Sequence, residues 1–369
     1  MPPRTSPRTA EAIVDLAAIA TNTKIVRSRT AAAVMAVVKA DAFGHGVVPV
    51  ARAALEGGAS WLGVVWPGEA VALRAAGITA PVLAWLYPPA AELRSAIAAE
   101  VDLAASTAQQ LTGIAAAADD RPARVHLKVD TGLARSGAAA DDWPALVAAA
   151  RRYERAGLIE VVAVWSHLAD TDDPALVAVQ TARLAAAVDI ATAAGLRPRL
   201  RHLANSAGAL HHPGSHLDLV RIGIALYGCE PAPRQPVGLR PAMTLRAPVV
   251  SVKRVPAGTG VSYRHEYVTA TETRLALVPV GYADGIPRAA AGSAQVWTGT
   301  ARRPVAGVVA MDQLVVDIGP DGPEPEEIVL FGPGDDGEPT VAEWARWADT
   351  IPHELLCRVG ARVERRHVG

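Results

Sequence analysis

A lysine closes an apolar stretch near the start of the chain, in the segment AVVKADAFGHG at 36–46. The run 33–38 has the composition of a buried strand, and Lys39 stands where that strand would leave its core. Lysine is rarely left fully buried without a purpose. An amine that is desolvated and close to other cations loses its proton more easily, and it then serves as a nucleophile or as a base. Lys39 is therefore the first candidate for chemistry.

Other polar residues end apolar runs in the same part of the chain. They are Lys128 with Asp130, Ser166 with His167, His202 with Asn205 and Ser206, and Arg221. Each alone has a structural explanation, such as a histidine satisfied in a core or an ion pair at its rim. With Lys39, five apolar runs end in such residues. A functional role gains support if the runs are parallel strands, because the carboxyl ends of parallel strands meet at one rim.

The order of segments predicts such strands. Eight apolar runs alternate with Ala-rich stretches of helical length up to about residue 228, at 34–39, 61–66, 81–86, 101–106, 125–130, 160–167, 199–206 and 217–223. Helices are predicted between them, among others at 47–57, 67–76, 90–99, 141–156 and 175–195. This pattern predicts an α/β fold, a (β/α)₈ barrel of the TIM type. A doubly wound open sheet gives a similar pattern and is the alternative.

After residue 240 the pattern changes to Val- and Thr-rich runs separated by Gly and Pro, and helical periodicity is nearly absent until 340–349. These features predict a mainly antiparallel β domain. The segment 229–241 contains four prolines and reads as the connector. We therefore assign 10–235 to the barrel and 236–369 to the β domain, with the N-terminal residues 1–9 as an optional part of the latter.

Composition limits the partners. The 369 residues carry a net charge of −1, which gives no reason to expect a nucleic acid or an acidic membrane as partner. The two cysteines fit a reducing compartment. The first ten residues lack the apolar core of a signal peptide, and no apolar run reaches about 18 residues. We expect a cytoplasmic protein that binds neither nucleic acid nor membrane and holds no metal.

An ordered series of motifs resembles the bacterial alanine racemases, a fold-type III pyridoxal-phosphate family. From about residue 10 to residue 365 the motifs are VVKADAFGHG, LKVDTGLARSG, HLANSAG, RIGIALYG, GVSYRHEY, VGYADG and AMDQ. The resemblance implies an isomerase with pyridoxal 5'-phosphate as cofactor, an amino-acid racemase that interconverts L- and D-alanine by a two-base mechanism. It also implies a head-to-tail homodimer, in which each active site combines the barrel of one subunit with the β domain of the other.

The resemblance assigns roles to the candidates. Lys39 would hold the cofactor and act as a base on one face of the substrate Cα, while Tyr263 of the partner subunit would act on the opposite face. His167 would hydrogen-bond that tyrosine, and Arg221 would support His167 and donate to the pyridine nitrogen. A guanidinium does not give up its proton at neutral pH, so the ring would be a weaker electron sink and proton return would compete well against transamination or decarboxylation.

Further roles concern the cofactor's oxygen atoms. The resemblance implies that Ser206 and the backbone amides of Gly223 and Ile224 bind the phosphate. It implies that Lys128 is carbamylated and that the resulting anion orients Arg135 beside the phenolic oxygen. Arg135 would also contact the substrate.

Several positions depart from the family pattern. Phe43 and His353 stand where tyrosines usually reach the phosphate, Val308 where an arginine is usual, and Ala310 where cysteine or serine is common, although Met311 and Asp312 of the substrate-binding region remain. We therefore expect weaker cofactor retention and a substrate preference that is broader than alanine or shifted from it. Two alternatives stay open: a racemase or epimerase for another amino acid, and a paralogue that binds pyridoxal phosphate without turnover.

Overall fold

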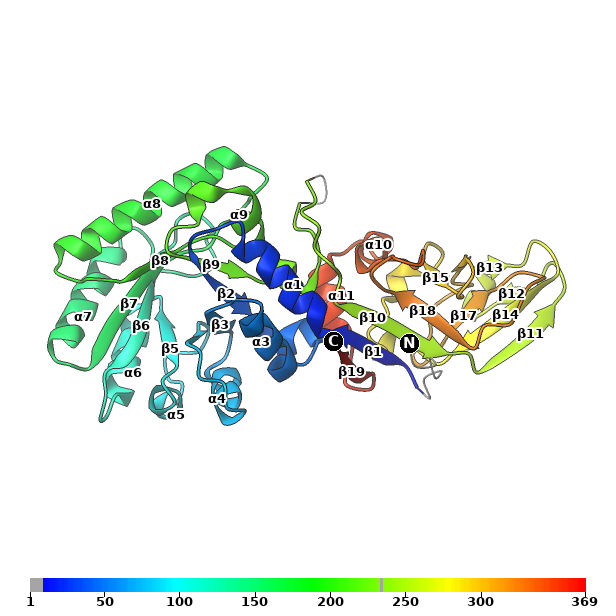
Figure 1. Ribbon diagram of the computed structural model, residues 1–369, viewed down its shortest axis with the longest axis horizontal. Helices are drawn as coiled ribbons and strands as arrows, with labels where there is room; N and C mark the ends of the chain where they lie inside the picture. Colours follow the sequence, from blue (N-terminus) through cyan, green and yellow to red (C-terminus); the bar gives the residue numbers. More distant parts are fainter. Residues whose placement is uncertain (1–8, 233–234) are drawn as a thin grey trace.

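The computed structural model describes residues 9–232 and 235–369, and it has a barrel at one end and a β domain at the other (Figure 1). The barrel sheet has eight parallel strands in the order β8-β7-β6-β5-β4-β3-β2-β9. They are β2 (Ala33–Val37), β3 (Trp61–Val64), β4 (Val82–Ala84), β5 (Asp102–Ala105), β6 (Ala123–Lys128), β7 (Ile159–Trp165), β8 (Leu200–His202) and β9 (Leu219–Ile222).

The two end strands of this sheet return to each other. The Arg221 amide donates to the Ala204 carbonyl at 3.0 Å, and the Asp218 amide donates to the Arg201 carbonyl at 3.1 Å. The sheet is therefore nearly closed, and the predicted barrel is confirmed over the open sheet. Each predicted apolar run overlaps one of the eight strands.

Helices cover the outside of the barrel (Figure 1). They are α1 (Leu16–Arg27), α3 (Val47–Glu56), α4 (Pro67–Ala75), α5 (Arg94–Ala98), α6 (Ala108–Ala117), α7 (Trp143–Arg155), α8 (Pro174–Ala193) and α9 (Ser206–His211). Of the described helices, α8 alone is long and apolar enough to cross a membrane by length and composition. Its buried residues Val177, Gln180 and Leu184 recur at helical spacing, as expected of a helix with one face on a barrel.

The β domain contains two sheets and a short strand pair. A six-stranded sheet has the order β16-β15-β18-β10-β1-β19, and a three-stranded antiparallel sheet has the order β11-β14-β17. The strands are β1 (Glu11–Asp15), β10 (Met243–Pro248), β11 (Ser251–Val255), β12 (Gly260–Val261), β13 (Tyr267–Val268), β14 (Thr273–Val278), β15 (Gln295–Trp297), β16 (Arg302–Pro304), β17 (Leu314–Asp317), β18 (Glu327–Phe331) and β19 (Glu364–Val368). Two helices, α10 (Val341–Trp347) and α11 (Pro352–Arg358), lie beside the larger sheet.

Strand β1 does not follow the predicted domain boundary. The range 10–235 assigned it to the barrel, but it pairs antiparallel with β10 and parallel with β19 inside the β-domain sheet. Its Ala12 and Val14 side chains are fully buried, and Glu11 forms a buried ion pair with Arg246. The assignment of β1 to the barrel was therefore wrong. The alternating pattern of a strand does not indicate which sheet the strand joins, because that depends on distant partners. Residues 1–8 of the optional N-terminal part lie outside the described residues.

A left-handed turn follows β2 and carries the candidate lysine. Helix α2 (Lys39–Gly44) contains 40–43, where every φ lies between 51° and 54°. This region costs about 1–2 kcal/mol per residue that has a Cβ. Hydrogen bonds hold the turn, because the Ala40 amide donates to Glu69 Oε1 at 2.9 Å and the Val47 amide donates to Asp41 Oδ1 at 2.8 Å. Four residues that all carry side chains, from Ala40 to Phe43, are thus held in the left-handed region.

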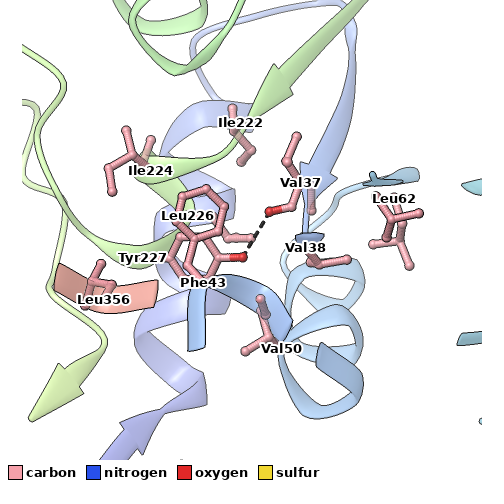
Figure 2. Packing of buried hydrophobic residues seen from close by; sticks show 14 of the residues in the cluster. Val37, Val38, Phe43, Val50, Leu62, Ile222, Ile224, Leu226, Tyr227 and Leu356 are labelled. Carbon is pink, nitrogen blue, oxygen red and sulfur yellow. Dashed lines mark hydrogen bonds between the residues drawn. The ribbon is translucent and has the colours of Figure 1, made fainter. Parts of the chain in front are cut away.

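Aromatic packing joins this turn to the end of the barrel. The centres of the Phe43 and Tyr227 rings lie 4.5 Å apart, and the Tyr227 hydroxyl donates to the Val37 carbonyl at 2.9 Å (Figure 2). The next residue, Gly228, has φ +82°, and a Cβ there would lie 1.8 Å from the Arg240 carbonyl oxygen. Only glycine fits this crossing between the barrel and the β domain.

Candidate active site

One cavity of about 1200 Å³ opens at the carboxyl ends of the barrel strands. The predicted residues that line it are Lys39, Phe43, Lys128, Arg135, His167, Ser206, Arg221, Gly223, Ile224 and His353. The barrel supplies most of the wall, and the β-domain segment from Pro333 to His353 contributes the rest. Residues far apart in sequence are thus brought together as the parallel-strand argument predicts.

Lys39 begins the left-handed turn at the cavity wall. Burial lowers the pKa of its amine from the usual value, and the nearby Arg135 lowers it further. Glu69 acts in the opposite direction but more weakly. The side chain therefore reaches its neutral, nucleophilic form more easily than a lysine in water.

Arg221 is held at the cavity by acceptors from neighbouring strand ends. One terminal nitrogen donates to His202 Nδ1 at 2.9 Å, and the other donates to the Ser166 and Leu203 carbonyls at 2.8 and 3.0 Å and to His167 Nδ1 at 3.0 Å. Burial lowers the pKa of the guanidinium to about 9, so the group stays charged at neutral pH. Within residues 9–232 and 235–369, no partner is found for its Nε–H.

His167 is neutral at the cavity wall. Burial and the charges of Arg221 and Arg135 lower the pKa of its imidazole to about 2. Because Nδ1 accepts a hydrogen bond from Arg221, the ring proton must sit on Nε2. The pair therefore leaves one imidazole N–H as a donor for a group that enters the cavity.

Lys128 ends β6 beside the same cations. Its amine donates to Ser136 Oγ at 2.5 Å and lies 4.5 Å from the centre of the Trp165 ring. Burial lowers the pKa of this amine to about 8, with Arg221 and Arg135 contributing. A substantial neutral fraction is thus present near physiological pH.

The loop that carries Arg135 is organised by one carboxylate. Asp130 Oδ1 accepts from the amides of Gly132, Leu133 and Ala134 at 2.8, 3.0 and 3.2 Å. This turn brings Arg135 back over the strand ends, where it lines the cavity with Lys128.

A cluster of donors lies where β8 and β9 end. The amides of Gly223 and Ala225 donate to Ser206 Oγ at 2.9 and 3.3 Å, so the Ser206 hydroxyl proton is free to point elsewhere. Ile224 begins the short helix η2 (Ile224–Tyr227), and the first amides of a helix have no partner inside it. This corner of the cavity is therefore suited to an anion.

Phe43 and His353 close the same corner. The centres of their rings lie 5.9 Å apart, and a Cβ built on Gly223 would lie 3.5 Å from Phe43 Cζ. Burial lowers the pKa of His353, and the charge of Lys39 lowers it further, so the imidazole is neutral. The corner thus lacks one hydroxyl that a tyrosine at residue 43 would bring.

The β-domain candidates lie elsewhere. Tyr263 is 69% exposed and Met311 is 53% exposed, and neither lines the cavity of its own chain. Asp312 forms an ion pair with Arg362 at 2.7 Å. Val308 is 4% exposed, so its side chain belongs to the interior of the β domain. One chain therefore does not bring the two groups of predicted residues together.

Family comparisons cover nearly the whole chain. The model of the alanine racemase N-terminal domain matches residues 14–231, and the model of the alanine racemase C-terminal domain matches residues 242–367. The chain belongs to the alanine racemase family. Alanine racemases from Frankia casuarinae and Thermobifida fusca are 55% and 53% identical to it, over 97% and 98% of this chain and 96% and 98% of theirs.

Solved structures agree with these matches. The alanine racemase from a D-cycloserine-producing Streptomyces lavendulae superposes with a TM-score of 0.96 at 46% identity, over 99% of this chain and 98% of that one. The alanine racemase of Streptomyces coelicolor gives a TM-score of 0.95 at 48% identity, over 98% of each chain. Since its curated relatives are isomerases, this alanine racemase family member is an isomerase too.

Two residues that line the cavity, Trp165 and Ser136, were not among the candidates from the sequence. Trp165 stacks on His202 with the ring centres 5.1 Å apart, and it lies beneath both Lys128 and Arg221. Ser136 receives the Lys128 hydrogen bond. Trp165 directly precedes the polar pair Ser166–His167, so its place at a strand end was the available signal.

Proposed function

We propose that the protein interconverts L- and D-alanine with pyridoxal 5'-phosphate as cofactor, by a two-base mechanism. The observation that carries the proposal is the placement of Lys39 and the Arg221–His167 pair around one cavity, with their protonation states separated. Lys39 is set to lose a proton, Arg221 keeps its proton, and His167 is neutral. Groups whose environments push their pKa values apart mark acid and base assignments.

The donor set supports pyridoxal phosphate. Lys39 is an amine with a lowered pKa and suits an aldehyde. The Nε–H of Arg221 has no partner among the described residues and suits an unprotonated ring nitrogen. The hydroxyl of Ser206, with the amides of Gly223 and Ile224, suits a phosphate. When bound, the cofactor supplies the electron sink that makes the substrate Cα proton removable.

The proposed proton transfers use residues of this chain. Lys39 removes the Cα proton from one face of the substrate in one direction of the reaction and delivers a proton to that face in the reverse direction. Arg221 keeps its proton, since a guanidinium with a pKa of about 9 remains charged at neutral pH, and it leaves the ring nitrogen unprotonated. This limits how much negative charge the ring withdraws and favours proton return over loss of carbon dioxide.

The opposite face needs a second base, because a single base returns the proton to the face from which it came. We assign this role to Tyr263 of the partner subunit in a homodimer. The phenol of Tyr263 is largely exposed and lies outside the cavity of its own chain, as a group used by another copy must. The Nε2–H of His167 is available to donate to the phenolic oxygen and favour its ionised form.

Three further assignments complete the proposal. Lys128 is carbamylated, since its pKa of about 8 leaves a reactive neutral amine, and the product orients Arg135. Arg135, with Met311 and Asp312 of the partner subunit, contacts the substrate. The protein is cytoplasmic, which agrees with the absence of a disulfide between the buried Cys229 and the exposed Cys357.

A second candidate function is racemisation of another amino acid. The observation that favours it is the presence of Phe43 and His353 at the cavity wall, where they change the size and polarity of the corner beside Ser206. Loss of a hydrogen bond to a charged group costs about 1.5–3 kcal/mol, which corresponds to weaker cofactor binding by about tenfold or more.

The test incubates the protein and added pyridoxal phosphate with L-alanine in heavy water, followed by chiral resolution and mass measurement. Deuterium at Cα of D-alanine is the expected result. A parallel incubation with a mixture of L-amino acids tests the second candidate function, which predicts that an amino acid other than alanine is inverted preferentially. Bound cofactor without exchange at any Cα would contradict both functions and leave the non-catalytic paralogue.

A further inference from the structure

A line of buried polar side chains crosses the barrel interior beneath the site. Asp102 Oδ2 lies 3.0 Å from His126 Nε2, His126 Nδ1 lies 2.9 Å from His202 Nε2, and His202 Nδ1 lies 2.9 Å from Arg221. The four side chains come from β5, β6, β8 and β9 and are at most 4% exposed. Asp102 is the first residue of its strand, whereas Arg221 faces the cavity at the carboxyl ends.

The far end of this line is closed by a second arginine. Arg124 Nε donates to Asp102 Oδ1 at 2.7 Å, and its terminal nitrogen donates to Oδ2 at 3.2 Å. Oδ1 therefore accepts from Arg124 alone, whereas Oδ2 accepts from both Arg124 and His126. The contacts with Arg124 and His126 lower the pKa of Asp102 against the opposing effect of burial, so the carboxylate is ionised.

The two ends of the line leave one arrangement of protons. A guanidinium has only donors and a carboxylate has only acceptors. His202 Nδ1 must accept from Arg221, so the His202 proton sits on Nε2 and is donated to His126 Nδ1. The His126 proton then sits on its Nε2 and is donated to Asp102. Any other neutral arrangement sets two protons or two lone pairs face to face.

This line bears on how Arg221 is held. Among residues 9–232 and 235–369, no carboxylate pairs directly with Arg221, whose partners are two carbonyls and two imidazole nitrogens. His202 is an acceptor for it only in the Nε2–H tautomer. The negative charge that selects this tautomer is on Asp102, and it acts on His202 through the imidazole of His126.

We propose that Asp102 and His126 are positioning residues that fix the tautomer of His202 and so hold Arg221, with its free Nε–H, against the cavity. The effect on catalysis rests on the proposed function, in which Arg221 faces the cofactor ring. The tautomer itself does not, because it follows from the protein's own hydrogen bonds.

The variant Asp102→Asn turns this geometry into a test. Arg124 offers donors to both oxygen positions, but its shorter contact, 2.7 Å against 3.2 Å, is with Oδ1. We therefore expect the amide oxygen to take the Oδ1 place and the amide NH₂ to face His126. His126 Nε2 then becomes an acceptor, both imidazole protons move to Nδ1, and the His202 proton points at the Arg221 donor. In the double variant with Arg124→Met the amide is free to turn its oxygen to His126, which restores the original tautomer.

The first readout is the ¹⁵N NMR spectrum of protein labelled with ¹⁵N-histidine, recorded with and without added cofactor. The His202 signals are identified as those that disappear in the variant His202→Gln. We expect His202 protonated on Nε2 in the unchanged protein, on Nδ1 in Asp102→Asn, and on Nε2 again in the double variant. Two results would overturn the proposal. One is a His202 proton on Nδ1 in the unchanged protein, which needs no variant at Asp102. The other is the same His202 tautomer in the unchanged protein, in Asp102→Asn and in the double variant.

The second readout is alanine racemisation. We expect kcat of Asp102→Asn to fall on the order of 10- to 100-fold with little change in KM, the size typical of a lost partner that orients a functional group, and to recover in the double variant. Arg124→Met alone serves as the matched control. A reversed tautomer with undiminished kcat overturns the positioning role. An unchanged protein with the expected tautomer but no racemisation contradicts the proposed function and leaves the tautomer assignment standing.

Discussion

The barrel and the β domain contribute to the candidate site in opposite ways. On the barrel side, Arg221 and His167 are locked by hydrogen bonds among buried strand ends before any ligand arrives. On the β-domain side, Tyr263 and Met311 are exposed and line no cavity of their own chain. A preorganised wall positions a small molecule well, because its donors need no rearrangement. Exposed groups need another surface to complete them, which is why we propose a shared site.

The largest expected effect separates a shared site from one formed within a chain. Lys39→Arg replaces the base by a group that keeps its proton, and Tyr263→Phe removes the phenol, so each variant should lose on the order of 10²- to 10⁴-fold in kcat. Mixing the two inactive variants under conditions of subunit exchange should restore about a quarter of the normal activity, because half of randomly formed dimers carry one intact site.

Two measurements keep this result interpretable. Each variant assayed alone at the same total concentration is the control, and sedimentation shows whether the subunits have exchanged. No recovery in a mixture that has exchanged would mean that Lys39 and Tyr263 act within one chain or that Tyr263 is not the second base.

The next effect concerns the crossing between the two regions. Gly228→Ala places a Cβ against the Arg240 carbonyl at a positive φ, and we expect the free energy of unfolding to fall by about 2–4 kcal/mol. Gly238→Ala is the matched control, since Gly238 also has a positive φ but has no atom within 4 Å of its Cβ position. It should lose about 1–2 kcal/mol. Denaturant unfolding checks both, and equal losses would contradict a steric role for the Gly228 crossing.

A smaller effect tests the altered anion corner. Phe43→Tyr adds a hydroxyl near Gly223 and Ser206, and we expect the Kd for pyridoxal phosphate to fall about tenfold, as for one added hydrogen bond to a charged group. Equilibrium dialysis followed by absorbance measures this affinity. Phe43→Leu, which adds no donor, should not tighten binding. Unchanged affinity in Phe43→Tyr would place the phosphate elsewhere.

The smallest effect is a pH dependence on the barrel side. The pKa of Lys128 is lowered to about 8, so the neutral amine that reacts with carbon dioxide grows as pH rises from 6 to 9. At constant dissolved carbon dioxide, a carbamate signal in the ¹³C spectrum should increase over this interval. Lys128→Met should lack the signal and lose a few-fold in activity. Absence of the signal at pH 9 in the unchanged protein would contradict carbamylation.

The sequence predicted much of the barrel side because its signals are local. Apolar runs and Ala-rich helices alternate over short distances, and parallel strands bring their carboxyl ends to one rim. Lys39, His167, Ser206 and Arg221 could therefore be placed near one another before any contact was known. Their roles came from the family resemblance and remain proposals.

The tertiary structure decided what depends on distant partners. Strand β1 has an alternating pattern that fits many sheets, and only its pairing with β10 and β19 assigns it to the β domain. The line from Asp102 through His126 to His202 joins residues 24 and 76 positions apart. Their side chains meet only when the sheet curls into a barrel. The chain pattern determined which polar residues end the strands, whereas the closure of the sheet determined which buried side chains share a proton.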